Sequence, residues 1–370
     1  MKRATQIVRA GLSETEQGNA FLSGPTFAGT YHTSGDPASS AYTYGRYHNP
    51  TWTAYEKAIT ELEGGVATIA FSSGMAAIAA VFGTTLKAGD RLVMPSDAYY
   101  TARMLASGFF QTIGVEVQLA PTAGNAQKDY LEEAKLLWLE TPSNPNLDVC
   151  DIALLVEAAH AAGALVVVDN TTASCLGQQP LLLGADFSLS SDTKVTTGHS
   201  DLVLGHITVR DNALADKIRA WRTQMGAIPG PMEVWLAHRS LHTLDMRIER
   251  HGKNAVAIAE FLASRPDVKG VRYPGLPNDP AYPIASRQMK FYGTVVGFEL
   301  QDKNTAEKFL KNCNLVIEAT SFGGLQTTAE RRGRWGGDKV AEGFIRLSVG
   351  CEDAQDLISD LEQALDKAKS

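Results

Sequence analysis

Apolar residues along the chain follow two spacings, which indicate alternating strands and helices between about residues 50 and 240. Short apolar runs predict strands at 67–71, 91–95, 115–119, 136–140, 164–169 and 186–190. Apolar residues that share one helical face predict helices at 51–63, 76–86 and 151–162. The run at 164–169 is apolar until its last residue, as in a central strand covered on both faces. The alternation predicts an α/β domain with a mostly parallel sheet.

The pattern changes after about residue 244. A long helix is predicted at 244–261, and further strands and helices are predicted at 268–273, 294–300, 305–311, 343–349 and 353–368. Residues 1–47, in contrast, are rich in Gly, Pro, Ser and Thr and show little periodicity, although they carry several aromatic residues that favour packing on another surface. We therefore predict an N-terminal arm at 1–47, an α/β domain at 48–243 and a smaller α+β domain at 244–370.

Composition and charge narrow the classes of partner. The chain has 370 residues, of which 44% are hydrophobic and 20% are charged, and these are ordinary globular values. Its net charge of −7 argues against a nucleic-acid or acidic-membrane surface. The four cysteines lie far apart without metal-ligand spacing, so we expect no metal site and a reduced, cytoplasmic compartment. We expect no membrane span, since the apolar runs are too short, and no signal peptide.

A lysine in a polar stretch is the first candidate for chemistry. Lys194 follows the strand predicted at 186–190 and lies among Ser and Thr, with Gly198 allowing the backbone to turn. If a cleft desolvates this lysine, the pKa of its amine falls and the amine becomes a nucleophile toward aldehydes. The alternative is a surface lysine in a polar loop, which is the common case for an isolated lysine.

Two further features suggest a site for a bound anion and a carboxylate that faces the ligand. Ser73, Gly74 and Met75 stand between a strand and a helix, where free backbone N–H groups can face an anion, although an ordinary βα turn has the same appearance. Asp169 ends a central strand, at the edge where α/β sheets bind ligands. Neither GxGxxG nor a P-loop GK[ST] is present, so neither a dinucleotide nor a nucleoside triphosphate is indicated.

The C-terminal region contains two groups of arginines, which we interpret differently. Arg346 lies inside an apolar strand and therefore needs a partner. The run Glu330-Arg331-Arg332-Gly333-Arg334-Trp335 is interpreted as a solvated charged surface.

These residues belong to strings that resemble one family. The strings are Tyr44-Gly45-Arg46-Tyr47-His48-Asn49-Pro50-Thr51, Glu140-Thr141-Pro142-Ser143-Asn144-Pro145, Asp169-Asn170-Thr171, Ser191-x-Thr193-Lys194-x-x-x-Gly198-His199-x-Asp201 and Ile345-Arg346-Leu347-Ser348-x-Gly350-x-Glu352-Asp353. Their order and spacing resemble the Cys/Met-metabolism family of pyridoxal-5′-phosphate (PLP) enzymes over nearly the whole chain. This family includes cystathionine γ-lyase, β-lyase and γ-synthase, methionine γ-lyase and homoserine-ester sulfhydrylases.

The resemblance implies a fold and a set of cofactor contacts. The fold would be that of the aspartate aminotransferase-like PLP-dependent transferases (fold type I), and PLP would be the cofactor. Lys194 would bind PLP covalently, and Asp169 would face its pyridine nitrogen, which keeps the ring able to accept electrons. The phosphate would lie against the Ser73-Gly74-Met75 turn, Ser191 and Thr193. Asn144 would contact the phenolate oxygen, and Tyr99 would stack on the ring and act as an acid or base.

Substrate contacts and assembly also come from the resemblance. Ser321 and Arg346 would hold the α-carboxylate of a small sulfur-containing amino acid. Tyr44 and Arg46 would reach the phosphate bound to a neighbouring subunit, so active sites would be shared within a homotetramer built as a dimer of dimers. Arg103 stands one residue short of the spacing of a substrate-loop arginine found in several members, so that role is not transferred to it. Relatives often carry Pro, Met, Thr and His where this chain has Arg331–Arg334, so the resemblance alone does not define the substrate.

Three functions remain open at this point. The chain is most similar to bacterial cystathionine γ-lyases, which implies γ-elimination of L-cystathionine to cysteine, 2-oxobutyrate and ammonia. The alternatives are γ-replacement by a cystathionine γ-synthase or homoserine-ester sulfhydrylase, and methionine γ-lyase activity. A non-catalytic scaffold is disfavoured, because Lys194, Asp169, Tyr99, Arg46 and Arg346 occur together in the expected order.

Overall fold

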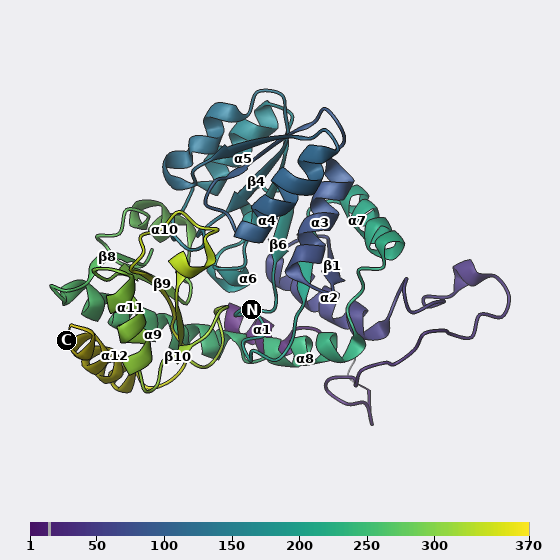
Figure 1. Ribbon diagram of the computed structural model, residues 1–370. Coiled ribbons are helices and arrows are strands. Elements are labelled where there is room, and N and C mark those ends of the chain that lie inside the picture. The colour runs from purple at the N-terminus through teal and green to yellow at the C-terminus, as the bar shows by residue number, and fades with distance from the viewer. Residues whose placement is uncertain (14–15, 370) are drawn as a thin grey trace.

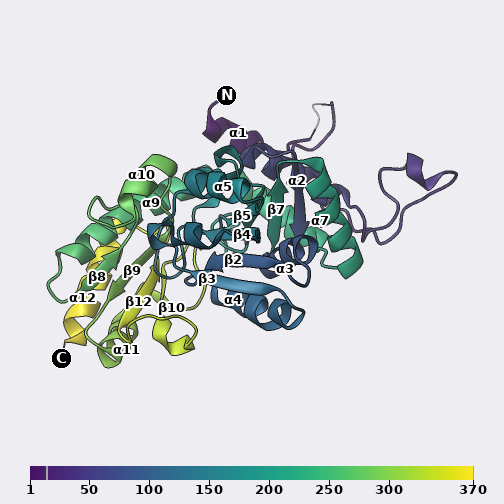
Figure 2. The ribbon, with the colours of Figure 1, turned by 90° about the horizontal axis from the view of Figure 1, so that it is seen from above.

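The computed structural model describes residues 1–13 and 16–369, and it contains two β-sheets (Figures 1 and 2). The larger sheet has seven strands in the order β1-β7-β6-β5-β4-β2-β3. Its strands are β1 (Ala67–Phe71), β2 (Arg91–Pro95), β3 (Glu116–Ala120), β4 (Ala134–Glu140), β5 (Leu165–Asp169), β6 (Phe187–Ser190) and β7 (Gly205–Val209). Only β7 runs antiparallel to its neighbours, β1 and β6. The predicted α/β class with a mostly parallel sheet is therefore confirmed, although the sequence pattern gave no indication of β7.

Helices cover both faces of this sheet, as the apolar strands require. Along β5, Val167 packs on one side, while Val166 and Val168 pack on the other. The Val167 side is covered by α3 (Gly74–Thr85), α4 (Tyr100–Leu105), the π-helical turn η2 (Ala106–Phe110) and α7 (Asn212–Met225), and the opposite side by α2 (Pro50–Glu63), α5 (Ile152–Ala161) and α8 (Pro231–Leu241). The central strands are thus removed from water on both sides.

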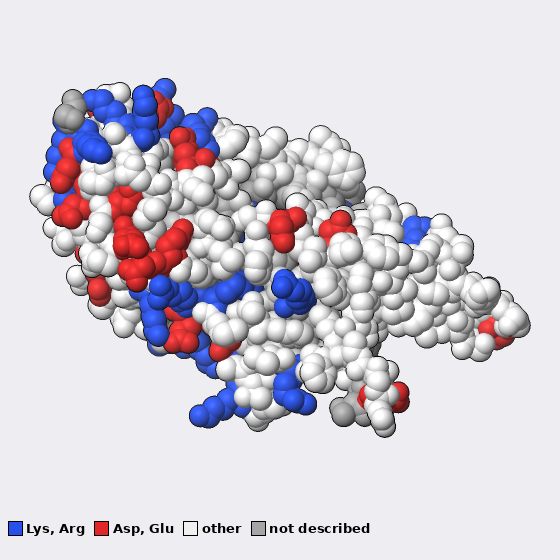
Figure 3. Space-filling model, turned by 90° about the horizontal axis from the view of Figure 1, so that it is seen from below, with Lys and Arg blue, Asp and Glu red and all other residues white. Residues whose placement is uncertain are grey.

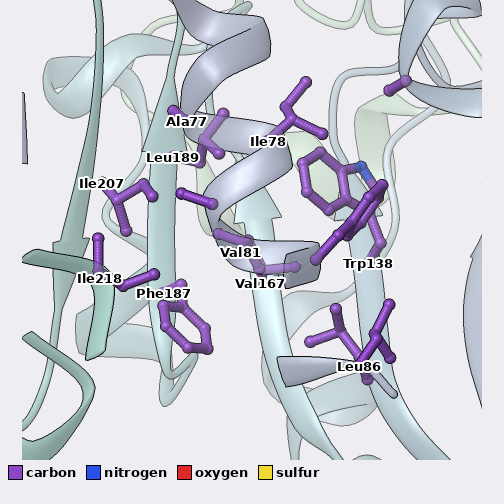
Figure 4. Packing of buried hydrophobic residues seen from close by; sticks show 14 of the residues in the cluster. Ala77, Ile78, Val81, Leu86, Trp138, Val167, Phe187, Leu189, Ile207 and Ile218 are labelled. Carbon is purple, nitrogen blue, oxygen red and sulfur yellow. The ribbon is translucent and has the colours of Figure 1, made fainter. Parts of the chain in front are cut away.

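Helix α3 is held against the sheet by its apolar face. Figure 4 shows Ala77, Ile78 and Val81 of this helix in the same cluster as Trp138, Val167 and other strand residues. Ser73 caps the helix by accepting a hydrogen bond from the Ala76 amide at 3.1 Å. This packing fixes the beginning of α3 at the end of β1, where the predicted anion-binding turn lies.

The second sheet has five strands in the order β10-β11-β12-β9-β8. Its strands are β8 (Lys269–Arg272), β9 (Val295–Glu299), β10 (Ile317–Glu318), β11 (Thr328–Arg331) and β12 (Phe344–Ser348), and its helices are α9 (Leu244–Ser264), α10 (Tyr282–Gln288), α11 (Lys303–Asn312) and α12 (Ala354–Ala368). In helix α9, Leu244 and Ile248 belong to the hydrophobic core formed with α2 and α8 beneath the first sheet, whereas Ala255 and Ile258 belong to the core of the second sheet. One helix therefore spans both cores, close to the boundary at 243/244 that we predict for the domains.

The N-terminal segment differs from the predicted irregular arm at its beginning. Residues Arg3–Arg9 form the helix α1, in which Ile7 is fully buried against Trp52 and Tyr55. The sequence pattern did not indicate this helix, because a seven-residue helix is too short to show clear periodicity. Its stability comes from packing rather than from helical propensity.

The following part of the arm extends away from the body (Figure 1). A short 3-10 turn, η1 (Pro37–Ser39), interrupts it, and an isolated bridge pairs Thr30 with Tyr44. Between residues 17 and 45 the single charged side chain is Asp36, and Figure 3 shows a protrusion with few charges beside a body that carries both signs. Phe21 and Phe27 are exposed on it. Within the part of the chain that the structure describes, every helix is too short or too polar to cross a bilayer.

Candidate active site

One cavity of about 310 Å³ lies where the first sheet meets the second. Glu140 of β4, Asp169 of β5 and Lys194 beyond β6 line it from the carboxyl ends of the strands, which is where open α/β sheets bind ligands. Ser321 and Arg346 line it from the second sheet. Ser73, Gly74, Met75, Tyr99, Asn144, Ser191 and Thr193 complete the predicted residues that it brings together.

Lys194 points into this cavity. Its Nζ donates a hydrogen bond to Ser321 Oγ at 2.7 Å and lies 5.2 Å from the centre of the Phe322 ring. Burial, and secondarily the charge of Arg346, lower the pKa of Lys194 to about 8. About a tenth of this amine is therefore unprotonated at pH 7, a much larger share than for a lysine of ordinary pKa, and the unprotonated amine is the form that attacks an aldehyde.

Buried charges fix the turn that carries Lys194. Asp192 is fully buried and pairs with His206 Nδ1 at 2.8 Å, while His206 Nε2 lies 3.3 Å from Glu63. Burial alone would lower the pKa of His206, but Asp192 and Glu63 raise it to about 10. Protonated His206 thus bridges two carboxylates and holds the turn against β7 and α2.

Two carboxyl groups lie side by side at the sheet edge, because Glu140 and Asp169 are register partners on β4 and β5. Burial is the main reason that both pKa values are raised, and the neighbouring Asp169 raises that of Glu140 further. Glu140 accepts hydrogen bonds from the Tyr99 amide at 2.7 Å and the Asn144 amide at 3.2 Å. Thr171 donates its amide to Asp169 at 3.0 Å. Asp169 is thereby oriented toward the cavity, where a cationic group would favour its ionised form.

The turn before α3 leaves donors free for an anion. The first amides of a helix have no intrahelical acceptor, and Ser73 satisfies that of Ala76, so those of Gly74 and Met75 remain. A Cβ on Gly74 would lie 2.7 Å from Ser191 Cβ, so a side chain cannot be placed there without a shift. Thr193 Oγ1 is engaged with the Leu204 backbone, donating at 3.2 Å and accepting at 3.1 Å.

Arg346 lies on the central strand of the second sheet and is almost completely buried. Its Nη1 donates to Asn144 Oδ1 at 2.9 Å, and its Nη2 donates to the Ser321 carbonyl at 3.0 Å and to Glu330. Its Nε is buried without a partner among the described residues. A buried guanidinium with an unused donor at a cavity wall is suited to an incoming carboxylate.

Glu330 corrects the interpretation of the arginine run. Glu330 is register partner of Arg346 and fully buried, and it accepts hydrogen bonds from Arg332 Nη1 at 2.9 Å, Arg334 Nη2 at 3.0 Å and Trp335 Nε1 at 2.8 Å. Arg331 and Arg332 are also buried. The prediction of a solvated charged surface was wrong, because sequence spacing did not reveal that a buried carboxylate gathers these side chains.

Tyr99 is the N-cap residue that precedes helix α4, lines the cavity and is 40% exposed. Tyr44 and Arg46, in contrast, lie on the arm and are not among the described residues that line the cavity. Arg46 donates to the Thr223 carbonyl at 2.8 Å, and its guanidinium lies 5.5 Å from the Tyr44 ring centre. These two residues are not brought to the cavity of their own chain.

Comparisons with known proteins assign the chain to one enzyme family. A profile of the Cys/Met metabolism PLP-dependent enzymes matches residues 4–366. The chain belongs to this family. A candidate cystathionine gamma-lyase of Streptomyces coelicolor is 56% identical over 98% of this chain and 93% of its own, and the cystathionine beta-lyase of Lactococcus lactis (strain MG1363) is 38% identical over 98% of each chain. The crystal structure of a Xanthomonas oryzae cystathionine gamma synthase, in complex with aminoacrylate and cysteine, superposes with a TM-score of 0.95 at 34% identity, covering 100% of this chain and 99% of that one.

The protein is thus a PLP-dependent enzyme of cysteine and methionine metabolism, and its fold is that of this family's enzymes. The residues present fit the cofactor. The crowded Gly74 turn offers backbone donors to a phosphate, Lys194 offers a desolvated amine to an aldehyde, and Asp169 offers a buried carboxylate to a ring nitrogen.

Sequence reasoning missed two residues that support this site. Glu140 bonds the backbones of both Tyr99 and Asn144, and Thr171 bonds both Asp169 and the Ser191 amide, the latter at 2.8 Å. Glu140 could have been found, because it ends an apolar strand as Asp169 does. The contacts of Arg103 with Asp338 and Gly337, more than 200 residues away, left no signal in the sequence.

Proposed function

We propose that the enzyme is a cystathionine γ-lyase, which converts L-cystathionine and water into cysteine, 2-oxobutyrate and ammonia. The observation that carries this proposal is one cavity that combines the amine of Lys194 with the carboxylate-binding guanidinium of Arg346. The 56% identity to the Streptomyces coelicolor protein favours the γ-lyase over other family activities.

Each side chain has a proposed task. Arg346, with its free Nε, binds the α-carboxylate, and Asn144 and Glu330 fix the guanidinium plane. Ser321 accepts a hydrogen bond from Lys194 and orients its Nζ, which takes the proton from Cα. PLP, when bound, supplies a ring that accepts electrons from the substrate. Tyr99, at the mouth, donates a proton to the sulfur that leaves Cγ.

Cofactor contacts complete the proposal. Asp169 would favour a proton on the ring nitrogen by its negative charge, and the Gly74 and Met75 amides and the Ser191 hydroxyl would hold the phosphate. We also propose that Tyr44 and Arg46 complete the phosphate site of a partner subunit in a homotetramer, and that the enzyme works in the cytoplasm. The weakly charged, extended arm and its exposed Phe21 and Phe27 support an intersubunit role.

A second candidate is γ-replacement, because the superposed Xanthomonas oryzae structure is a cystathionine gamma synthase. The test is purified protein with L-cystathionine, or with O-succinylhomoserine and cysteine, analysed by mass spectrometry. Cysteine and 2-oxobutyrate from cystathionine alone are expected. Net formation of cystathionine from the ester, without cleavage, would replace the lyase proposal by the synthase.

A further inference from the structure

The segment after β11 contributes a third buried cation to the active-site cavity. Arg332 begins the 3-10 turn η5 (Arg332–Trp335), is 8% exposed and lines the same cavity as Lys194 and Arg346. These three are the cationic side chains in the described lining. The lining carboxyl groups, Glu140 and Asp169, belong instead to the strand ends of the first sheet.

Arg332 is held in place before any ligand arrives. Its Nη1 donates to Glu330 Oε1 at 2.9 Å, and its Nε donates to Asp338 Oδ2 at 3.1 Å, which also accepts from Nη2. Asp338 in turn accepts from Arg103 Nη2 at 3.3 Å. A guanidinium has five N–H donors, so about two remain for a ligand. Because the side chain is already fixed, binding costs little conformational entropy.

The charges of this cluster favour an anion. Arg103, Arg332, Arg334 and Arg346 are connected through Glu318, Glu330 and Asp338, so four guanidinium groups face three carboxylates. Arg332 and Arg346 share Glu330 Oε1 and are therefore neighbours on the wall. When Arg346 binds an α-carboxylate and Lys194 serves the cofactor, Arg332 is the remaining lining cation for a second acid group.

We infer that Arg332 determines specificity by binding a second acidic group of the amino-acid substrate. The site then prefers thioether amino acids with a distal carboxylate over those with a neutral side chain, such as methionine. This inference rests on the proposed function, since it takes the ligand to be an amino acid bound at Arg346.

The experiment measures binding with ligands that contain no sulfur. L-2-aminosuberate and L-2-aminooctanoate have the same chain length and differ by a terminal carboxylate against a methyl group. Each is titrated into the PLP-loaded enzyme and its Kd is read from the cofactor absorbance. The variants are Arg332→Gln, Arg332→Lys and, as the matched control from the same turn, Arg334→Gln. Arg334 is more exposed and lies outside the described lining.

We expect the wild-type enzyme to bind aminosuberate about 10- to 100-fold more tightly than aminooctanoate, the range for a hydrogen-bonded charge. Arg332→Gln should reduce that ratio to below about 3 while changing the Kd of aminooctanoate little, and Arg332→Lys should restore part of it. Arg334→Gln should keep the ratio. Equal loss of both ligands in Arg332→Gln, an unchanged ratio, or no wild-type preference would overturn the inference.

The result is separable from that of the cystathionine assay. A wild-type preference for aminosuberate that depends on Arg332, without cleavage of cystathionine, would sustain the inference and remove the lyase proposal. Cleavage of cystathionine with no dependence on Arg332 would do the reverse. Comparing kcat/KM for cystathionine and methionine in the same variants then extends the binding ratio to turnover.

Discussion

At the scale of single residues, the site depends on burial, which shifts the pKa values of its lysine and arginine side chains. Burial desolvates both Lys194 and Arg346, but the two side chains differ in their hydrogen-bond partners. Arg346 is bonded to Asn144, Ser321 and Glu330, whereas Lys194 bonds a neutral hydroxyl. The guanidinium therefore stays charged for carboxylate binding, while the amine can lose its proton for chemistry.

The pKa of Lys194 predicts how cofactor uptake depends on pH. In the cofactor-free protein this pKa is about 8, so the reactive unprotonated amine increases as pH rises through that value. The rate of PLP incorporation, followed by absorbance, should rise between pH 7 and 9 and level off above. Lys194→Ala should show no covalent incorporation and no turnover, whereas Lys253→Ala, an exposed lysine on α9, should match wild type. A midpoint near the ordinary lysine value would contradict the role of burial.

Arg346 predicts a separation of binding from turnover. Arg346→Gln should raise KM for amino-acid substrates by about 10- to 100-fold, since a charged hydrogen bond to the α-carboxylate is lost. The kcat should fall less than kcat/KM. Arg250→Gln removes a half-exposed arginine of α9 and serves as control in steady-state kinetics. Unchanged KM in Arg346→Gln would exclude Arg346 as the carboxylate site.

At the scale of elements, the buried ion pairs of β11 and β12 make a stability prediction. Glu330 is fully buried and pairs with Arg346, Arg332 and Arg334. Glu330→Gln leaves the buried guanidinium of Arg346 without its carboxylate partner, whereas Arg332 keeps Asp338 and Arg334 keeps Glu318. We expect a loss of about 3–5 kcal/mol in the free energy of unfolding. Glu318→Gln removes a half-exposed partner of Arg334 and should cost less than about 1 kcal/mol. Urea denaturation of both variants measures the difference, and equal losses would refute it.

Helix α1 makes a second prediction at this scale. Ile7 is fully buried whereas its neighbour Val8 is 52% exposed. Ile7→Ala should therefore cost about 2–5 kcal/mol through a cavity beside Trp52 and Tyr55, and Val8→Ala should cost well under about 1 kcal/mol. Chemical denaturation of the pair provides the measurement. A silent Ile7→Ala would mean that α1 contributes no packing energy.

These elements also show what the sequence could and could not predict. Strands such as Leu165–Asp169 were predictable because an all-apolar run that ends in a carboxylate is typical of a central parallel strand. Lys194, Asp169 and Arg346 were found through motifs, and the structure gathers them at one cavity. The Glu330 network was missed because the spacing of residues does not reveal that Glu330 is buried opposite Arg346 in the cross-strand register, where Arg332 and Arg334 also reach it. Helix α1 was missed because its seven residues are too few to show a helical repeat in the sequence.

At the scale of the whole molecule, the active site is assembled from both sheets while the arm points elsewhere. The cavity takes Lys194 from the first sheet and Ser321 and Arg346 from the second, with α9 spanning both cores. Tyr44 and Arg46 lie on the extended arm, outside the described lining of that cavity. We propose that their motif serves the phosphate site of another copy of the chain.

Subunit complementation tests whether active sites are shared. Arg46→Ala should weaken PLP binding, and Lys194→Ala should abolish turnover, so each variant alone is defective. In a hybrid dimer, the Lys194→Ala subunit lends its intact arm to the site that still holds Lys194. Random mixing puts about half of all subunits in hybrids with one intact site of two, so about a quarter of wild-type activity should return at limiting PLP. Activity that remains the plain average of the two variants would show that each chain completes its own site. Arg219→Ala, which removes a partly exposed arginine of α7, is the control for surface charge.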